Sequence, residues 1–332
     1  MSGEIKVNSI VGPSLEFQYI PSVFIDGMAS AAKNGNYGFI DKTGEFIIPC
    51  VYHAVDSFRD GLACVQRHSK WEYINKAGQT VIPEVSEISG WFNNGLANVQ
   101  QEGMHGFINK NGEFVIPCIY DAAGVFSEGL AAVGKHGKCG FINRNGDIII
   151  PIEYDMIRNF SDGLAGVIQD GKLGYMDKTG DIVIDCIYDE AESDNFSGGI
   201  ARVYKNGEVM FIDKTGNIVV KCGEYSKVGV FREELAAVTK DSKRGFINQT
   251  GEIVIPCVYD EAYVFGGGLA GVAKDGKVGY INKSGEIVVP FRYDYDNLSG
   301  PGSPKWMFVN PFRENLALVR KDGKWGILEI EA

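Results

Sequence analysis

The sequence lacks several features that would point to a membrane, a metal or a nucleic acid. No apolar run among its 332 residues approaches the roughly 18 to 20 residues that a membrane-spanning helix needs. The seven cysteines include no C-x-x-C spacing, so they predict no zinc site. Acidic residues outnumber basic ones by 43 to 32, and the net charge of −11 disfavours binding to phosphate backbones. We therefore expect no membrane span, no metal and no nucleic-acid partner.

Motifs of catalysis and secretion are missing as well. No nucleophile elbow or phosphate-binding loop occurs, and the four histidines share no position within the repeats described below. Residues 1–20 lack a basic segment followed by an apolar one, so no secretory signal is visible unless one has been removed. An odd number of cysteines favours a reducing compartment. We expect a cytoplasmic protein that is not an enzyme and carries no cofactor; an active site assembled from distant loops is the alternative.

A short motif recurs from one end of the chain to the other. Its most regular part is a Gly-Leu-Ala step, and most neighbouring copies lie 34 residues apart. The step falls at Gly27, Gly61, Gly95, Gly129, Gly163, Gly199, Glu234, Gly268 and Asn315. A fixed period of this length marks a repeat architecture. The sequence therefore predicts one repeat domain over residues 1–332, with about nine units of about 34 residues each.

Each unit contains short apolar segments separated by turns. Segments such as Gly245 to Asn248 and Glu252 to Pro256 are β-branched or aromatic, and no window shows the 3.6-residue period of an amphipathic helix. The link from Asn143 to Gly146 begins with an Asx residue and ends with glycine, which predicts a hairpin turn. The proline at the end of the third segment either stops that strand or places it at a sheet edge. We expect three strands in each unit and an almost entirely β protein.

Three positions of the repeat are nearly constant. A phenylalanine, expected to be the core anchor of its unit, stands at Phe24, Phe58, Phe92, Phe126, Phe160, Phe196, Phe231, Phe265 and Phe312. An alanine, expected where neighbouring backbones come close, stands at Ala29, Ala63, Ala97, Ala131, Ala165, Ala201, Ala236, Ala270 and Ala317. The third position holds Cys50, Cys118, Cys186, Cys222 and Cys257, and in other units Glu84, Ile152 and Phe291. This mixture indicates partly buried packing and not metal binding.

The string from Gly268 through Asp275-Gly276-Lys277 to Pro290 resembles the bacterial WG-repeat (KWG-repeat) family, and the resemblance covers essentially the whole chain. The full signature occurs once, from Lys321 to Ile327. The position of the name-giving tryptophan varies, and holds Tyr37, Trp71, His105, Cys139, Leu173, Val209, Arg244, Val278 and Trp325. The glycine beside it becomes Glu72 in one unit and Met210 in another. The resemblance implies a β-rich repeat used for binding, with no assigned chemistry.

The two ends of the chain carry complementary fragments of a unit. Gly3 to Val7 resembles a third strand, whereas the segment from Lys324 to Ile330 has no third strand after it. Joined, the two ends complete a ninth unit. We therefore expect a closed β-propeller of about nine short blades, in which N- and C-terminal strands close the ring. Because about 34 residues is short for a blade, an open β-solenoid or superhelix is the alternative.

The longest departure from the period is an insertion at about residues 296–308. It contains Lys305, Trp306, Met307 and Phe308, which are residues typical of interfaces, and repeat proteins often place binding function in such insertions. We take these four as the candidate binding residues, with no catalytic and no metal-binding residues. The structural alternative is a plug that seals the junction between the two ends.

Charged turns and a Tyr-Asp pair also recur. The Lys or Arg of the hairpin link and the Asp or Glu of the Phe-x-x-Gly turn predict a basic and an acidic rim on different edges, although turn chemistry alone could select both. Tyr-Asp pairs such as Tyr154-Asp155 are the only support for a glycan- or peptidoglycan-binding module. The leading hypothesis is a binding scaffold for an unidentified protein partner. The glycan module is the alternative, and an enzyme is third.

Overall fold

The computed structural model describes residues 5–15, 17, 23–85, 89–189, 195–295 and 311–331. Every regular element in these ranges is a β-strand. No helix in the described part of the chain is long and apolar enough to cross a membrane. The chain divides into two compact units: unit 1 comprises Met1–Tyr52 with Glu224–Ala332, and unit 2 comprises His53–Gly223. The expectation of one continuous domain over residues 1–332 stays a prediction.

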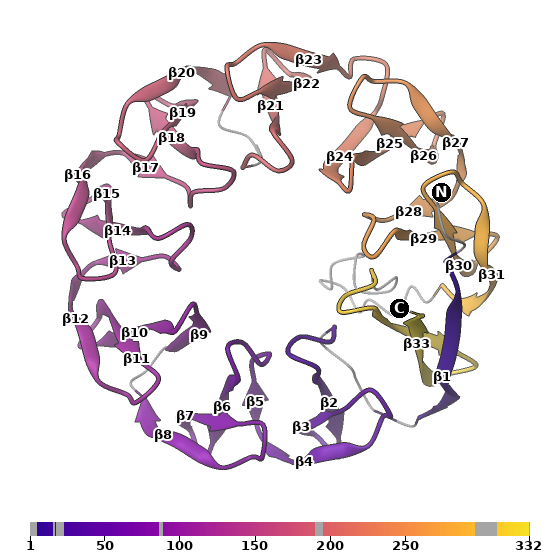
Figure 1. The fold of residues 1–332 in the computed structure, drawn as a ribbon, viewed down its shortest axis with the longest axis horizontal. Helices are drawn as coiled ribbons and strands as arrows, with labels where there is room; N and C mark the ends of the chain where they lie inside the picture. The colour runs from indigo at the N-terminus through magenta and orange to yellow at the C-terminus, as the bar shows by residue number, and fades with distance from the viewer. Residues whose placement is uncertain are drawn as a thin grey trace. The chain divides into compact units, whose positions relative to one another are not determined.

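Unit 2 consists of antiparallel sheets whose strands follow one another in chain order (Figure 1). The first two sheets are β5 (Ala54–Val55), β6 (Leu62–Arg67), β7 (Lys70–Asn75) and β8 (Thr80–Val85), then β9 (Ser89–Asn93), β10 (Leu96–Gln101), β11 (Met104–Asn109) and β12 (Phe114–Tyr120). The third is β13 (Ala122–Ala123), β14 (Ala131–Lys135), β15 (Lys138–Ile142) and β16 (Ile148–Tyr154). The last repeats are β17 (Met156–Ile157), β18 (Ala165–Gln169), β19 (Lys172–Met176) and β20 (Ile182–Asp189), then β21 (Ile200–Lys205), β22 (Glu208–Asp213) and β23 (Ile218–Lys221). A single pair, Asp189 with Tyr204, joins these last two repeats.

Unit 1 contains the remaining sheets. They are β2 (Ala29–Lys33), β3 (Asn36–Ile40) and β4 (Phe46–Tyr52); β24 (Lys227–Arg232), β25 (Leu235–Lys240), β26 (Lys243–Asn248) and β27 (Ile253–Tyr259); and β28 (Glu261–Ala262), β29 (Leu269–Lys274), β30 (Lys277–Asn282) and β31 (Ile287–Asp294). One further sheet has the order β1 (Val7–Leu15), β33 (Lys324–Ile330), β32 (Leu316–Lys321). The two ends of the chain therefore build one sheet together, as the sequence predicted, and Val7 pairs with Ile330 (Figure 1). The N-terminal strand, however, covers Val7–Leu15 and not the predicted segment from Gly3 to Val7.

The hairpin predicted between the second and third strands is confirmed. In the turn from Asn143 to Gly146, the N–H groups of Asn145 and Asp147 donate to Oδ1 of Asn143 at 2.9 and 3.0 Å. Gly146 has a φ of 88°, which side chains disfavour and glycine adopts freely. The side chain of the Asx residue and the glycine together close a tight link, so the register between the two strands is set locally.

The third strand and the fourth differ from the sequence prediction. Strand β16 does not stop at Pro151 but continues to Tyr154, and it forms the edge of its sheet. Of the two predicted outcomes, a strand that stops at the proline or a strand at the sheet edge, only the second is correct. A residue without an N–H is tolerated at an edge because no neighbouring strand needs that donor. The segment after Tyr154 adds a fourth, two-residue strand, β17, which was not predicted and pairs with β18.

The core lies between consecutive repeats. The phenylalanine anchor is buried in every repeat, and Phe160 contacts the Phe141 ring of the preceding repeat with ring centroids 4.6 Å apart. Tyr175 and Phe196 form the equivalent pair at 4.8 Å. The constant alanine is also buried throughout, at 0% exposure for Ala165. The prediction of a core anchor is confirmed, and the anchor explains how one repeat docks on the next. The close approach of backbones expected at the alanine stays a prediction.

The glycine beside the variable tryptophan position has a steric cause. Between β15 and β16, Cys139 pairs with Tyr154 and Phe141 with Ile150, so β16 bulges toward Gly140. A Cβ on Gly140 would lie 2.6 Å from the carbonyl oxygen of Ile150. Between β22 and β23 the pairs Met210–Lys221 and Phe211–Val220 leave no bulge. Met210 can therefore occupy this position, which is glycine in the repeats that have the same bulge as β16. Glu72 faces a smaller register shift, between the pairs Trp71–Val85 and Tyr73–Ile82.

Candidate binding surfaces

The candidate residues Lys305, Trp306, Met307 and Phe308, and the insertion at about 296–308 that contains them, lie outside the described residues. They stay predictions. The cleft and the outer strips described below were not singled out from the sequence, whereas the charged turns and the Tyr-Asp pairs were.

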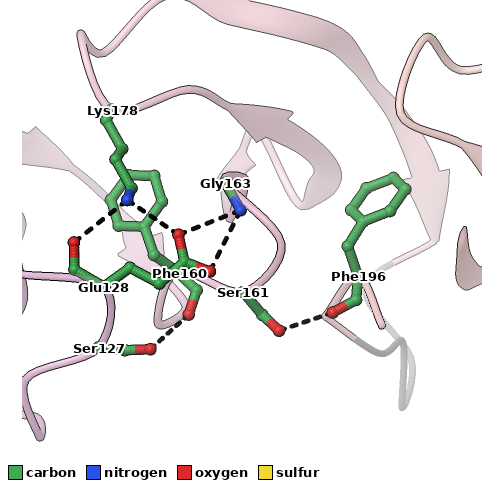
Figure 2. Close-up of polar contacts among 7 residues, drawn as sticks. All are labelled: Ser127, Glu128, Phe160, Ser161, Gly163, Lys178 and Phe196. Atoms are coloured by element: carbon green, nitrogen blue, oxygen red, sulfur yellow. Dashed lines mark hydrogen bonds and ion pairs between the residues drawn. The ribbon is translucent and has the colours of Figure 1, made fainter. Parts of the chain in front are cut away.

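The acidic turn and the basic hairpin of neighbouring repeats meet, and the prediction that they form separate rims is wrong. Figure 2 shows Lys178 and the N–H of Gly163 directed at the carboxylate of Glu128. Lys178 Nζ lies 3.0 Å from Oε2 of Glu128 and also donates to its carbonyl at 3.1 Å. Partial burial would raise the pKa of Glu128, but these hydrogen bonds outweigh it and hold that pKa below its usual range. We name this set of contacts the turn latch.

Equivalent turn latches occur in other repeats. The carboxylate of Asp60 accepts from the N–H of Gly95 at 2.6 Å, and that of Asp162 from Gly199 at 2.8 Å. In unit 1, Glu233 accepts from Gly268 at 3.0 Å. These carboxylates join one repeat to the next, so contacts between repeats, and not turn chemistry alone, explain why the position is acidic.

The serine of the Phe-Ser turn adds a second link between repeats. Ser127 Oγ donates to the carbonyl of Phe160 at 2.7 Å, and Ser161 Oγ donates to the carbonyl of Phe196 at 2.6 Å (Figure 2). Each bond fixes the backbone just after Asn159 or Asn195. The two asparagine side chains are thereby held in defined places at the surface described next.

A cleft of about 630 Å³ lies in unit 2 beside strand β13. One wall comes from Ala122, Ala123 and Gly124, with Ala132, Val133 and Cys139 behind them, and the other from Ile157, Arg158, Asn159 and Asn195. This volume falls within the usual range for binding sites, about 300 to 1,000 Å³. The walls combine small apolar side chains with two amides and a guanidinium, so the cleft can bury apolar groups and orient polar ones.

The cleft exists because three positions of this repeat hold small residues, which leave space unfilled. Gly124, Ala132 and Cys139 lie together on one side of the sheet. Where Cys139 stands, other repeats place Trp71, Arg244 or Trp325. Burial raises the pKa of the Cys139 thiol, so this cysteine is protonated at neutral pH and opens space without being a nucleophile.

Polar atoms in the cleft are incompletely satisfied. Within the described part of the chain, Oδ1 of Asn195 is buried and has no hydrogen-bond partner. Oδ1 of Asn159 lies over Gly124, 3.1 Å from where a Cβ would stand. A buried amide oxygen without a donor costs free energy, which a bound donor group would recover.

The outermost strand of each repeat forms an apolar strip on the solvent side. In β12 the side chains of Val115, Pro117 and Ile119 point the same way because strand residues alternate faces. Val115 and Ile119 are 40% and 43% exposed. The same positions in β16 and β20 expose Ile149, Val183 and Ile187. We call Val115, Ile119, Ile149, Val183 and Ile187 the outer strips of unit 2.

The Tyr-Asp pair is structural. Tyr120, Tyr188, Tyr259 and Tyr293 are buried, so their rings cannot stack on a sugar. Asp260 accepts from Lys243 Nζ and from the N–H of Asp275 at 2.8 Å, which ties one repeat to the turn of the next. These four buried pairs give no support to a glycan module, whereas Tyr154 is half-buried.

The cysteines pack as expected. None of the seven forms a disulfide, and Sγ of Cys118 and Cys186 lies 3.8 Å from a backbone carbonyl oxygen. No group of three or more potential metal ligands was found among the residues that the structure describes.

One comparison with a solved structure supports the fold, and two further structures match with lower TM-scores. A crystal structure described as the eukaryotic initiation factor matches with a TM-score of 0.56 and 11% identity, over 82% of this chain and 86% of that one. The dihydro-heme d1 dehydrogenase NirN matches at 0.47 and 11%, over 86% and 78%. The WD40 domain of SCAP from fission yeast matches at 0.42 and 9%, over 98% of both chains. At these identities the likeness concerns the fold alone.

The repeat itself is matched by a family model. No match was found among curated protein sequences. The model described as WG containing repeat matches residues 37–71, 73–104, 106–139, 140–172, 174–208, 210–243, 245–277, 279–295 and 303–325. The all-β, propeller-type repeat fold predicted from the sequence is thereby confirmed, and such repeat folds are typical of binding scaffolds. The chain belongs to the WG containing repeat family.

Proposed function

We propose that this protein is a non-enzymatic scaffold that binds another protein through the outer strips of unit 2. The supporting observation is the recurrence of exposed apolar side chains at equivalent positions of consecutive sheets. A single exposed Val or Ile needs no explanation, because much of any protein surface is apolar. A repeated set that includes Ile119, Ile149 and Ile187 offers a partner several apolar contacts, one sheet after another.

The edges of the same strands are protected against uncontrolled pairing. Pro117 in β12 and Pro151 in β16 lie on edge strands and remove backbone donors there. A partner would therefore contact side chains of the outer strips and not extend the sheet at this edge. We propose a cytoplasmic location, because seven cysteines that form no disulfide fit a reducing compartment.

Affinity capture from a cell lysate tests this function when it compares matched variants. The doubly charged variant Val115→Lys with Ile119→Lys places two ammonium groups in one strip, and a second variant combines Val183→Lys with Ile187→Lys. The control is Glu153→Lys, since Glu153 occupies in β16 the position of Ile119 and is already polar and exposed. Surface changes of this kind alter stability by about 0.5 kcal/mol or less, so each variant should fold.

We expect the wild type and Glu153→Lys to retain the same protein, and both doubly charged variants to lose it by at least about tenfold, or 1.4 kcal/mol. Equal retention by all variants would refute the proposed surface. A further variant, in which residues 297–308 are replaced by a short Gly-Ser link, tests the candidate residues Trp306, Met307 and Phe308. Loss of the partner only in that variant would move the site to the insertion.

A further inference from the structure

The two-residue strand that begins a repeat directs one backbone carbonyl away from its own sheet. In β13 the N–H of Gly124 bonds to β14 at 2.8 Å, so the adjacent Ala123 has its C=O on the opposite side of the strand. In β17 the N–H of Arg158 bonds to β18 at 2.8 Å, and the C=O of Ile157 likewise faces away from β18. Each of these carbonyls can accept a hydrogen bond from outside its sheet.

In two places a side chain of the preceding repeat supplies the donor for this carbonyl. Nδ2 of Asn98 donates to the carbonyl of Ala123 at 2.9 Å. In unit 1, Nη1 of Arg244 donates at 3.2 Å to the carbonyl of Ala262, the second residue of β28. The pocket that Arg244 lines there has a volume of about 200 Å³, against about 630 Å³ for the cleft. Such a side chain satisfies the carbonyl and fills space between two repeats.

The cleft is a place where this donor is missing. Ala132 stands at the repeat position of Asn98, and Cys139 stands at that of Arg244. Within the described part of the chain, no side chain donates to the carbonyl of Ile157, which lines the cleft. Burial raises the pKa of the Cys139 thiol, and a backbone hydrogen bond from Ile157 lowers it in part. A bond that lowers a thiol pKa comes from an N–H donor, so the carbonyl oxygen of Ile157 stays available.

The charges around the cleft favour an uncharged donor. Arg158 carries the one formal charge among the residues that line the cleft. In unit 1 the guanidinium of Arg244 is paired with Glu261 at 2.8 Å, but Met156 stands at the position of Glu261 in β17. A cationic donor would be repelled by Arg158 with no lining carboxylate to balance it, whereas a neutral carboxamide would not. The carboxamide oxygen could in turn accept from the amide of Asn159.

We propose that the cleft binds a primary carboxamide attached to a compact apolar group. An N–H of the carboxamide donates to the carbonyl of Ile157 in place of the missing side chain, and the apolar group fills the space beside Ala132 and Cys139. The cleft and the outer strips share no residue, so this inference does not depend on the proposed function. Such a carboxamide can belong to a small molecule or to an Asn or Gln side chain of a peptide, and the probes separate these two sources.

The probes are benzamide and cyclopentanecarboxamide as free amides, and an alanine peptide with one central glutamine, blocked by acetyl and methylamide groups. N,N-dimethylbenzamide and benzoate are matched controls that lack the N–H donors. Saturation-transfer NMR titrations measure dissociation constants on the wild type, Ala132→Asn and Ala237→Asn. The first variant installs the residue that Asn98 provides at this position and closes the cleft. The second is the same substitution at the equivalent, half-buried position of unit 1.

We expect the wild type and Ala237→Asn to bind the free amides equally, and Ala132→Asn to bind them at least about tenfold more weakly. N,N-dimethylbenzamide and benzoate should bind the wild type more weakly by a similar factor. Tighter binding of the glutamine peptide than of the free amides would assign the carboxamide to a protein, and the reverse order to a small molecule.

Three results would overturn the proposal: no binding of any amide probe, equal binding to Ala132→Asn, or equal binding of N,N-dimethylbenzamide. If circular dichroism shows that Ala132→Asn does not fold, Cys139→Leu replaces it. That variant fills the cleft with the residue that Leu173 provides at the same position of the next repeat.

Discussion

At the scale of single residues, carboxylates in turns accept several hydrogen bonds from their own turn. In the hairpin from Asp213 to Asn217, Oδ1 of Asp213 accepts from Thr215 Oγ1 at 2.7 Å and from the N–H groups of Thr215 and Asn217 at 2.9 and 3.0 Å. The hydrogen bond from the Thr215 side chain is the largest cause that lowers the pKa of Asp213 from 3.8 to about 2. The charged form is favoured because several donors converge on one oxygen.

The lowered pKa of Asp213 should make the stability of the fold depend on pH under acidic conditions. A carboxyl whose pKa is lower in the folded state stabilises the fold above its unfolded pKa, and this contribution is lost as the pH falls from about 3.8 toward 2. Asp213→Asn should fold, because Asn143 and Asn248 occupy the same turn position. Thermal melts between pH 5 and 2 should show a steeper loss of Tm for the wild type than for Asp213→Asn. Parallel curves would contradict the assigned pKa.

At the scale of elements, the bulge of the third strand determines where glycine is required. Gly38, Gly106, Gly140, Gly174 and Gly245 each lie against a bulged third strand. The φ angle at these glycines is not positive, so the constraint is lack of space and not backbone conformation. The third strand opposite Met210 has no bulge between the pairs Met210–Lys221 and Phe211–Val220, which is why a side chain fits in this repeat.

Gly140→Ala should therefore be costly. Its Cβ would lie 2.6 Å from the Ile150 carbonyl, and overpacking of this kind costs about 1 to 3 kcal/mol. Gly134→Ala on the adjacent strand is the control, because its Cβ would make ordinary contact at 3.4 Å with the Cβ of Ala122. Urea unfolding of both variants provides the comparison. An equal effect of the two substitutions would show that the bulge is not what demands Gly140.

Features within one repeat could be predicted from the sequence. Contacts between repeats could not, because they depend on how the repeats stack. The hairpin at Asn143 to Gly146, the anchor Phe160 and the constant Ala165 follow from local chemistry and from the period. The meeting of Lys178 with Glu128 depends on how one repeat stacks on the next, which spacing along the chain does not show. The cleft likewise arises where Cys139 and Asn195 from different repeats converge.

At the scale of the whole molecule, the two chain ends share one sheet. Strand β1 pairs with β33, and Val11 packs on the buried cluster that contains Leu318 and Ile327. The adjacent Ile10 is exposed. Since alternate residues of a strand face opposite sides, these neighbours report separately on docking of the N-terminal strand.

Val11→Asp should lower the free energy of unfolding by about 1 to 3 kcal/mol, because a carboxylate would be placed against apolar side chains without a partner. Ile10→Asp should change it by about 0.5 kcal/mol or less. Chemical unfolding followed by circular dichroism measures both. If the two substitutions had equally small effects, the pairing of β1 with the C-terminal strands would be contradicted.

The central functional claim is that a partner protein binds the outer strips. Hydrogen–deuterium exchange of the protein with its captured partner tests it most directly, since contact areas become protected whatever the partner is. We predict new protection in peptides that cover Val115 to Ile119, Ile149 to Glu153 and Val183 to Ile187. Protection confined to other segments, with these three strands exchanging as in the free protein, would contradict the claim.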